Sequence, residues 1–94
     1  MIKYPCQVST FIASGSGVLD SESIKVINYN SNVDVQFTPD TGWYVDKIIV
    51  EDSDGVVSEY KSSDLTKSGS TYTLSLEEIK RDTTVTINLT TTSL

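Results

Sequence analysis

The stretch of sequence that decides the fold is VDVQFTPDTGW, residues 33–43. Apolar side chains occupy every second position of its first half: Val33, Val35 and Phe37. Such alternation predicts a β-strand with one face in a core and the other in water. Pro39 then presets φ for the second position of a β-turn, and Gly42 permits the positive φ of a chain reversal. The stretch therefore predicts a half-buried strand followed by a tight turn.

Similar patterns recur on both sides of this strand. Val, Ile and Thr supply 30 of the 94 residues, whereas Ala occurs once, which is a strand composition. Residues 43–52 carry a more continuous apolar run, typical of a central strand covered on both faces. Further strands are expected at residues 6–13, 18–19, 23–28, 43–52, 56–60, 71–76 and 84–90.

The segments between these strands are polar and rich in turn residues. Asp54-Gly55 separates two strand patterns and predicts a hairpin with a type I′ turn. Residues 28–32 and 61–70 are expected to be loops, the second being the longest exposed connection. Residues 77–82 are expected to form a single helical turn or a tight loop that Ile79 attaches to the core.

About seven short, mostly antiparallel strands in fewer than 100 residues predict an all-β fold, a small Ig-like β-sandwich. The length suits a single domain over residues 1–94. Residues 1–5 and 90–94 extend beyond the expected sandwich, so we expect short flexible ends there.

The charge of the chain argues against two classes of partner. It has 13 acidic against 7 basic residues and a net charge of −6, whereas nucleic acids and anionic membranes require clustered basic residues. The sequence contains neither an export signal nor an apolar run long enough to cross a membrane, so we expect no membrane insertion. A native Met1 would place synthesis in a cytoplasm; if Met1 is not native, a secreted multidomain parent is the alternative, and both options stay open.

The residue types needed for several kinds of chemistry are missing. Without histidine, the Ser-His-Asp and Cys-His arrangements cannot form, and the lone Cys6 is expected to be a small buried apolar residue. We therefore expect no enzyme, no cofactor and no resident metal. Asp52 and Asp54 do not fit an EF-hand loop, and an ordinary hairpin turn is favoured over a weak surface calcium site there.

Aromatic residues are the candidates for partner contacts. Trp43 and Tyr44 are adjacent, so a strand directs them to opposite faces, and Trp43 is expected inside with Tyr44 covering the sheet. The alternative is an aromatic anchor formed by Tyr44 with Tyr29 or Tyr60, because tyrosine is enriched at interfaces. The pattern indicates no strong apolar patch, so contacts are expected at strand edges or at the loops 28–32 and 61–70.

Several phrases of the sequence resemble a known family. They are FTPDxGWxV at 37–45, IIV at 48–50, SxYTL at 70–74 and IxxDTTVTI at 79–87. Together they resemble the internalin-type B-repeat-like bacterial repeat domains over residues 33–89. The resemblance implies a β-sandwich scaffold rather than an activity. The residues that define the fold are then Phe37, Pro39, Gly42, Trp43, Tyr72 and Asp82, where Asp82 caps the turn before the last strand.

Two functions remain open. The first is a non-catalytic structural protein that decorates a phage capsid or another virion surface. Many copies on a lattice would turn a weak contact, made with a positively charged coat protein, into stable occupancy. The second is a binding or spacer repeat of a bacterial cell-surface protein. Self-association also stays open, although Lys25, Lys47 and Lys61 are expected to blunt exposed strand edges.

Overall fold

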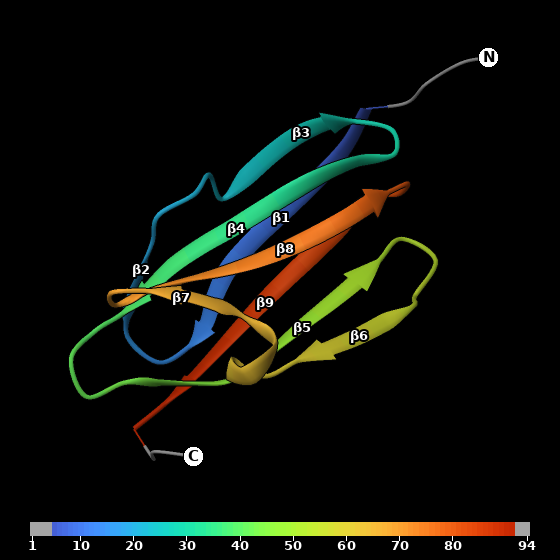
Figure 1. The fold of residues 1–94 in the computed structure, drawn as a ribbon. Coiled ribbons are helices and arrows are strands. Elements are labelled where there is room, and N and C mark those ends of the chain that lie inside the picture. The colour runs from blue at the N-terminus through green and yellow to red at the C-terminus, as the bar shows by residue number, and fades with distance from the viewer. Residues whose placement is uncertain (1–4, 92–94) are drawn as a thin grey trace.

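A computed structural model describes residues 5–91 (Figure 1). Within this range it contains nine strands and one short 3₁₀ helix, η1. In chain order they are β1 (Pro5–Ser14), β2 (Gly17–Leu19), β3 (Ile24–Asn28), β4 (Ser31–Pro39), β5 (Tyr44–Asp52), β6 (Val57–Tyr60), η1 (Ser62–Asp64), β7 (Thr66–Ser68), β8 (Thr71–Ile79) and β9 (Thr83–Thr90). The all-β prediction is confirmed, with nine strands where about seven were expected and with several strands longer than expected.

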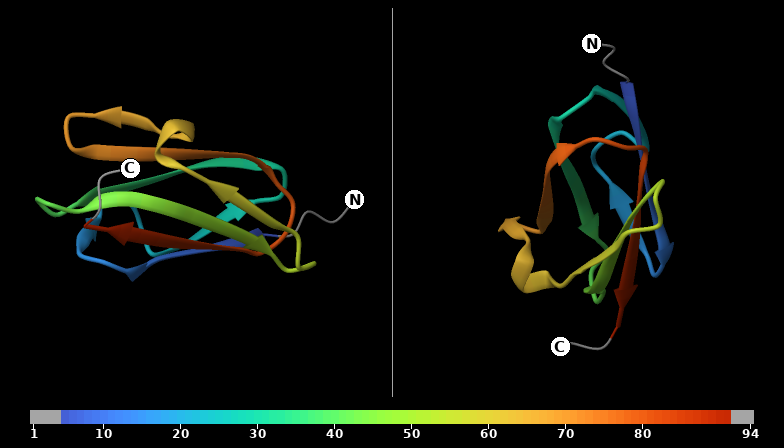
Figure 2. Two further views of the ribbon diagram at one scale, coloured as in Figure 1. Left: turned by 90° about the horizontal axis from the view of Figure 1, so that it is seen from below. Right: turned by 90° about the vertical axis from the view of Figure 1, so that its right-hand side faces the viewer.

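The strands form two packed sheets, seen as layers in Figure 2. One sheet has five strands in the order β3-β1-β9-β5-β6, and the other has four in the order β2-β4-β8-β7. β1 and β9 pair in parallel, whereas every other pair in the described residues is antiparallel. The sandwich with mostly antiparallel pairing is thus confirmed.

The path of the chain from β4 to β9 explains the Ig-like character. It crosses between the sheets after β4, after β6 and after β8, and it stays within one sheet for the hairpins β5-β6 and β7-β8. This is the path of strands B to F in a variable-type Ig sandwich. β1 occupies the place beside β9 where strand G would lie, and it runs parallel to β9.

The core lies between the two sheets and follows the alternation in the sequence. The buried apolar residues are Cys6, Val8, Ile27, Val33, Val35, Phe37, Val45, Ile48, Leu74, Leu76, Ile79, Val85, Ile87 and Leu89. The Phe37 ring stacks on the Tyr72 ring with 5.6 Å between centroids. Cys6 is buried as expected. The alternating pattern therefore predicted which face of the long strands points inward.

A bulge shifts this alternation within β5. Val45 and Ile48 are both buried although three positions separate them, because Asp46 is an extra residue in the ladder with β9. Ile48 then points into the core while Ile49 lies on the outer face, half-buried. The expectation that the apolar run is covered on both faces is therefore wrong for Ile49.

The turn after β4 spans residues 40–43, two residues later than a turn with Pro39 at its second position. The Trp43 N–H donates to the Asp40 carbonyl at 2.9 Å, and Gly42 has a φ of 90°. Pro39 is not in this turn but is the last residue of β4, where it pairs with Gly17. β8 pairs with β4 only as far as Phe37, so the missing N–H of Pro39 removes no ladder bond.

The hairpin between β5 and β6 forms, but with a different turn. Among the described non-glycine residues, Asn30 and Glu78 have a positive φ. Asp54 does not, so the turn is not type I′. The Gly55 N–H donates to the Asp52 carbonyl, and the Asp52 N–H donates to the Val56 carbonyl. This is a three-residue loop with a glycine bulge. The Asp52 carboxylate favours it by accepting from the Asp54 and Val56 N–H groups.

Two segments expected to be irregular belong to the four-stranded sheet. Residues 61–70 contain η1 and β7, and β7 pairs with the first three residues of β8. Residues 77–79 continue β8 instead of forming a helical turn, although Ile79 is buried as expected. Glu78 has a φ of 52° because two β8 residues lie opposite Asn32, whose side chain accepts the Glu78 N–H at 3.0 Å. Neither segment alternates in the way that the long strands do.

The turn at residues 14–17 brings β1 close to β9. Gly15 has a φ of 99°, and a β-carbon there would lie 2.5 Å from the β-carbon of Leu89 and 3.1 Å from the Trp43 ring. A glycine is therefore required both by the backbone conformation and by the space. Of the ends expected to be flexible, Pro5 and Thr90 lie in strands, and residues 1–4 and 92–94 lie outside the described residues.

Candidate functional site

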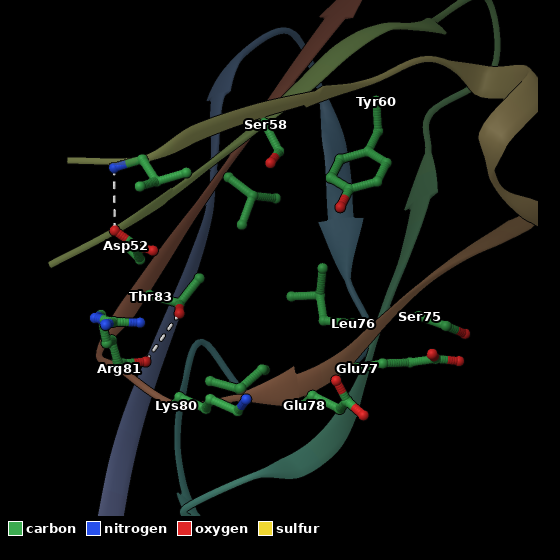
Figure 3. Close-up of a pocket in the computed structure, with 13 residues that line it drawn as sticks. Asp52, Ser58, Tyr60, Ser75, Leu76, Glu77, Glu78, Lys80, Arg81 and Thr83 are labelled. Atoms are coloured by element: carbon green, nitrogen blue, oxygen red, sulfur yellow. Dashed lines mark hydrogen bonds between the residues drawn. The ribbon is translucent and has the colours of Figure 1, made fainter. Parts of the chain in front are cut away.

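A hollow opens between the two sheets where β6 faces β8 (Figure 3). β6 is the edge strand of its sheet, and β7 covers only Thr71–Thr73 of β8, so the remainder of β8 has a free edge. The hollow between these edges has a volume of about 430 Å³. It exists because β7 is much shorter than β8.

The lining of the hollow combines apolar side chains with hydroxyls. Val50, Leu76 and Ile79 supply the apolar part. The Tyr60 ring and the Ser58 hydroxyl come from β6 and point across the hollow toward Leu76 (Figure 3). This composition is typical of a shallow non-covalent binding groove.

Two of the charged residues at the rim, Asp52 and Arg81, hold segments of the chain together. The Asp52 carboxylate accepts two backbone N–H groups of its own hairpin, at 2.9 and 3.1 Å. Arg81 forms an ion pair with Asp54 and thereby connects this hairpin to the β8-β9 connection. Glu77 and Glu78 are exposed to solvent. The arrangement favours binding over acid–base chemistry.

The three tyrosines proposed as partner contacts lie apart. Tyr60 pairs with the buried Ile48 and so shares the inner face of the sheet, whereas Tyr44 lies on the outer face and is 42% exposed. Tyr29 lies in the turn before β4, and Tyr44 follows the end of β4, so nine residues of strand separate them. The structure therefore does not assemble one anchor from these residues.

A second hollow surrounds the turn after β4. Trp43 is half-buried against the core, in agreement with its predicted inward position, and lines this hollow with Tyr44 and Tyr72. Lys67 lies over the Tyr72 ring, with its Nζ 5.4 Å from the centroid. No local sequence pattern groups these residues, because Tyr72 reaches the turn only through the register of β4 and β8.

Asp82 has a different role from the expected turn cap. Its Oδ1 accepts the Gln7 N–H at 2.9 Å, and its backbone carbonyl accepts the Ser53 N–H. Asp82 thus joins β1, the β5-β6 hairpin and the start of β9. The contact depends on the parallel pairing of β1 with β9, which no local sequence pattern predicts.

The outer face of the five-stranded sheet carries the most exposed apolar surface. We call the following set the outer apolar band: Phe11, Ile24, Val26, Ile49 and Val57. Phe11 is 47% exposed, Ile24 58% and Val26 64%. Phe11 of β1 lies opposite Thr86 of β9, and Thr86 lies opposite Ile49 of β5. Ile24 of β3 is a diagonal neighbour of Phe11, and Val57 of β6 is a diagonal neighbour of Ile49. The band takes residues from β1, β3, β5 and β6, and Thr86 of β9 lies between Phe11 and Ile49.

The band corrects the expectation that no strong apolar patch exists. Alternation over residues 6–13 already directs Phe11 outward, and this was the signal available in the sequence. The positions of Ile24 and Val26 needed the register between β1 and β3, which the short segment 23–28 does not reveal. Contiguous apolar patches on a soluble protein commonly mark interaction surfaces.

No family model matches the chain, and no curated protein or solved structure is detectably similar to it. Over residues 5–91, no group of three or more Cys, Asp or Glu side chains is arranged to hold a metal ion. The described part of the chain also has no helix long and apolar enough to span a membrane.

Proposed function

We propose that the chain is a non-catalytic structural and interaction protein that decorates the surface of a phage capsid or another virion. The observation that carries the proposal is the outer apolar band, which gives the sandwich one face suited to a protein partner. An acidic module of net charge −6 suits a coat protein with a complementary basic surface. Repetition on a lattice compensates for a modest single contact.

The test is attachment to intact particles. The tagged chain is mixed with particles from its own source, and the particle-bound fraction is measured after sedimentation, with coat protein identified by mass spectrometry. We expect the chain to sediment with the particles. The Phe11→Ser variant should lose most of the bound fraction, whereas Val18→Ser, which changes an exposed residue of the other sheet, should bind normally. Failure of the unaltered chain to bind contradicts the proposal.

A second candidate function has its own supporting observation. Because β1 and β9 run parallel, the start of β1 and the end of β9 lie at opposite ends of a molecule 48 Å long (Figure 1). Tandem spacer repeats need this placement, since each copy must pass the chain on to the next. The resemblance to internalin-type B-repeat-like domains supports a spacer or binding repeat of a bacterial cell-surface protein.

The size of the native polypeptide separates the two candidates. An antibody against the chain, used on both cell-surface and particle fractions of the source, should detect a band near 10.3 kDa with the particles if the chain is a decoration protein. A much larger band in the cell-surface fraction would instead favour the repeat.

A further inference from the structure

β3 is the longest of the four strands that lie at an edge of the described sheets. The uncovered part of β8, residues 74–79, is protected by Glu77, Glu78 and the bulge opposite Asn32. Among the described edge strands, β2 and β7 have three residues each, β6 has four and β3 has five. In an antiparallel pair, alternate residues direct both backbone groups to the same neighbour. The Thr10 N–H donates to the Ser23 carbonyl at 2.7 Å, so Ser23, Lys25 and Ile27 are the residues that direct their backbone groups toward β1. The backbone groups of Ile24, Val26 and Asn28 therefore point away from β1.

The side chains of β3 give this edge little protection. Exposed edge strands usually carry several charges, a proline or a bulge that prevents pairing with another chain. β3 has one charged residue, Lys25, between the exposed Ile24 and Val26. By contrast, the shorter β6 edge carries Glu59, in a chain that is already strongly acidic.

We propose that β3 pairs antiparallel with β3 of a second copy, which joins the two five-stranded sheets into one continuous sheet. With the twofold axis at Val26, Val26 lies opposite Val26 of the second copy, and Ile24 lies opposite Asn28. Each of these pairs exchanges two bonds, about six in all. Every outward N–H and C=O of Ile24, Val26 and Asn28 is then paired.

The charge on β3 selects this register. With the axis at Val26, Lys25 lies opposite Ile27 of the second copy. Moving the axis by one residue would bring Lys25 directly opposite its own copy in a pair with roughly 4.5 Å between α-carbons, which like charges disfavour. Moving the axis the other way, to Ile27, would place Ile24 opposite Asn30, whose N–H already donates to the Ile79 carbonyl, so fewer bonds would form. The register centred on Val26 therefore pairs the most backbone groups without opposing like charges, and this self-complementary edge favours a second copy.

The two copies should associate reversibly. A pair of short strands buries less than the roughly 1,200 Å² of a stable specific interface, so we expect a dissociation constant on the order of micromolar or weaker. Each copy carries a net charge of −6, so added salt should strengthen the dimer by screening the repulsion.

Sedimentation equilibrium of the purified chain over a wide range of concentration tests the proposal. Val26→Pro removes an N–H that points away from β1, so no hydrogen bond to β1 is lost. Proline is tolerated at such positions of an edge strand. Val57→Pro makes the same change on β6, where Val57 also lies on the outer face and is similarly exposed. Val26→Lys and Val57→Lys repeat the comparison without altering the backbone.

We expect the unaltered chain and both Val57 variants to dimerise equally, and both Val26 variants to dimerise at least about tenfold more weakly. A monomer at every concentration, or an equal loss in the Val57 variants, overturns the proposal; a monomer would leave the β3 edge to a strand of another protein. The measurement uses the purified chain alone, so its outcome is independent of attachment to particles.

Discussion

The two faces of the five-stranded sheet are built by the same strands, but they follow the sequence pattern to different degrees. The inner faces of β1 and β9 are buried almost completely, as their alternation predicts. The outer face is polar on β9, where Thr84 and Thr86 point out, but it carries exposed apolar side chains on β3 and, at Phe11, on β1. Alternation therefore predicts what a central strand buries, but it does not predict what the same sheet presents to solvent.

The largest expected effect comes from the inner face. Ile87→Ala removes a fully buried side chain at the centre of the core, and we expect the free energy of unfolding to fall by about 2–5 kcal/mol. The neighbouring Thr86→Ala changes an outward side chain on the same strand and should cost less than about 0.5 kcal/mol. Urea denaturation measures both. Similar losses for the two variants would show that the faces do not differ in this way.

The next effect concerns the turn between β1 and β2, which packs against Leu89 of β9. Gly15→Ala forces a β-carbon against Leu89 at a positive φ, so we expect a loss of more than about 2 kcal/mol. Gly55→Ala has a similar φ but open space around it, and it should lose only about 1 kcal/mol. Thermal unfolding measures both variants. Equal losses would mean that backbone strain alone, and not the close approach, makes Gly15 necessary.

A smaller effect is expected at the polar end of the same sheet. Asp82→Ala leaves the Gln7 N–H without its protein acceptor, and we expect a loss of about 1 kcal/mol because this contact is exposed. Asp82→Asn keeps an acceptor oxygen and should retain most of the stability. The melting temperature should fall by roughly 4–8 °C in Asp82→Ala. An unchanged melting temperature would show that the contact does not stabilise the β1-β9 pair.

The smallest effect on stability is expected on the outer face of the five-stranded sheet. Phe11→Ser should change the free energy of unfolding by less than about 0.5 kcal/mol, because Phe11 is half exposed. The outer apolar band would then contribute to association and not to folding. A loss comparable to that of Ile87→Ala would show instead that Phe11 belongs to the structural core of the sheet.

Much of the fold was predictable because the long strands repeat one simple pattern. Val33, Val35 and Phe37 were placed on the core face correctly. The errors concern segments where backbone detail outweighs alternation. The type I′ turn was wrong because the Asp52 side chain stabilises another turn. β7 was missed because its three residues are all exposed and polar.

The candidate surfaces were less predictable than the fold. Tyr29, Tyr44 and Tyr60 were chosen by residue type, but each lies on a different part of the molecule. The outer apolar band was missed because it collects residues from several strands. Diagonal neighbours such as Phe11 and Ile24 meet only once the register between β1 and β3 is known.

The sequence by itself determined the class of the protein, an all-β sandwich with a small core and no histidine. It also determined the tight turn at Gly42, after which the Trp43 ring packs at the edge of that core. These properties follow from local composition and from the period of two along a strand. Only the tertiary structure decided that β1 lies parallel to β9, that Asp82 reaches Gln7, and that β3 is an open edge. The physical reason is that pairing between distant strands depends on which faces and ends meet, and such contacts leave no periodic trace in the chain.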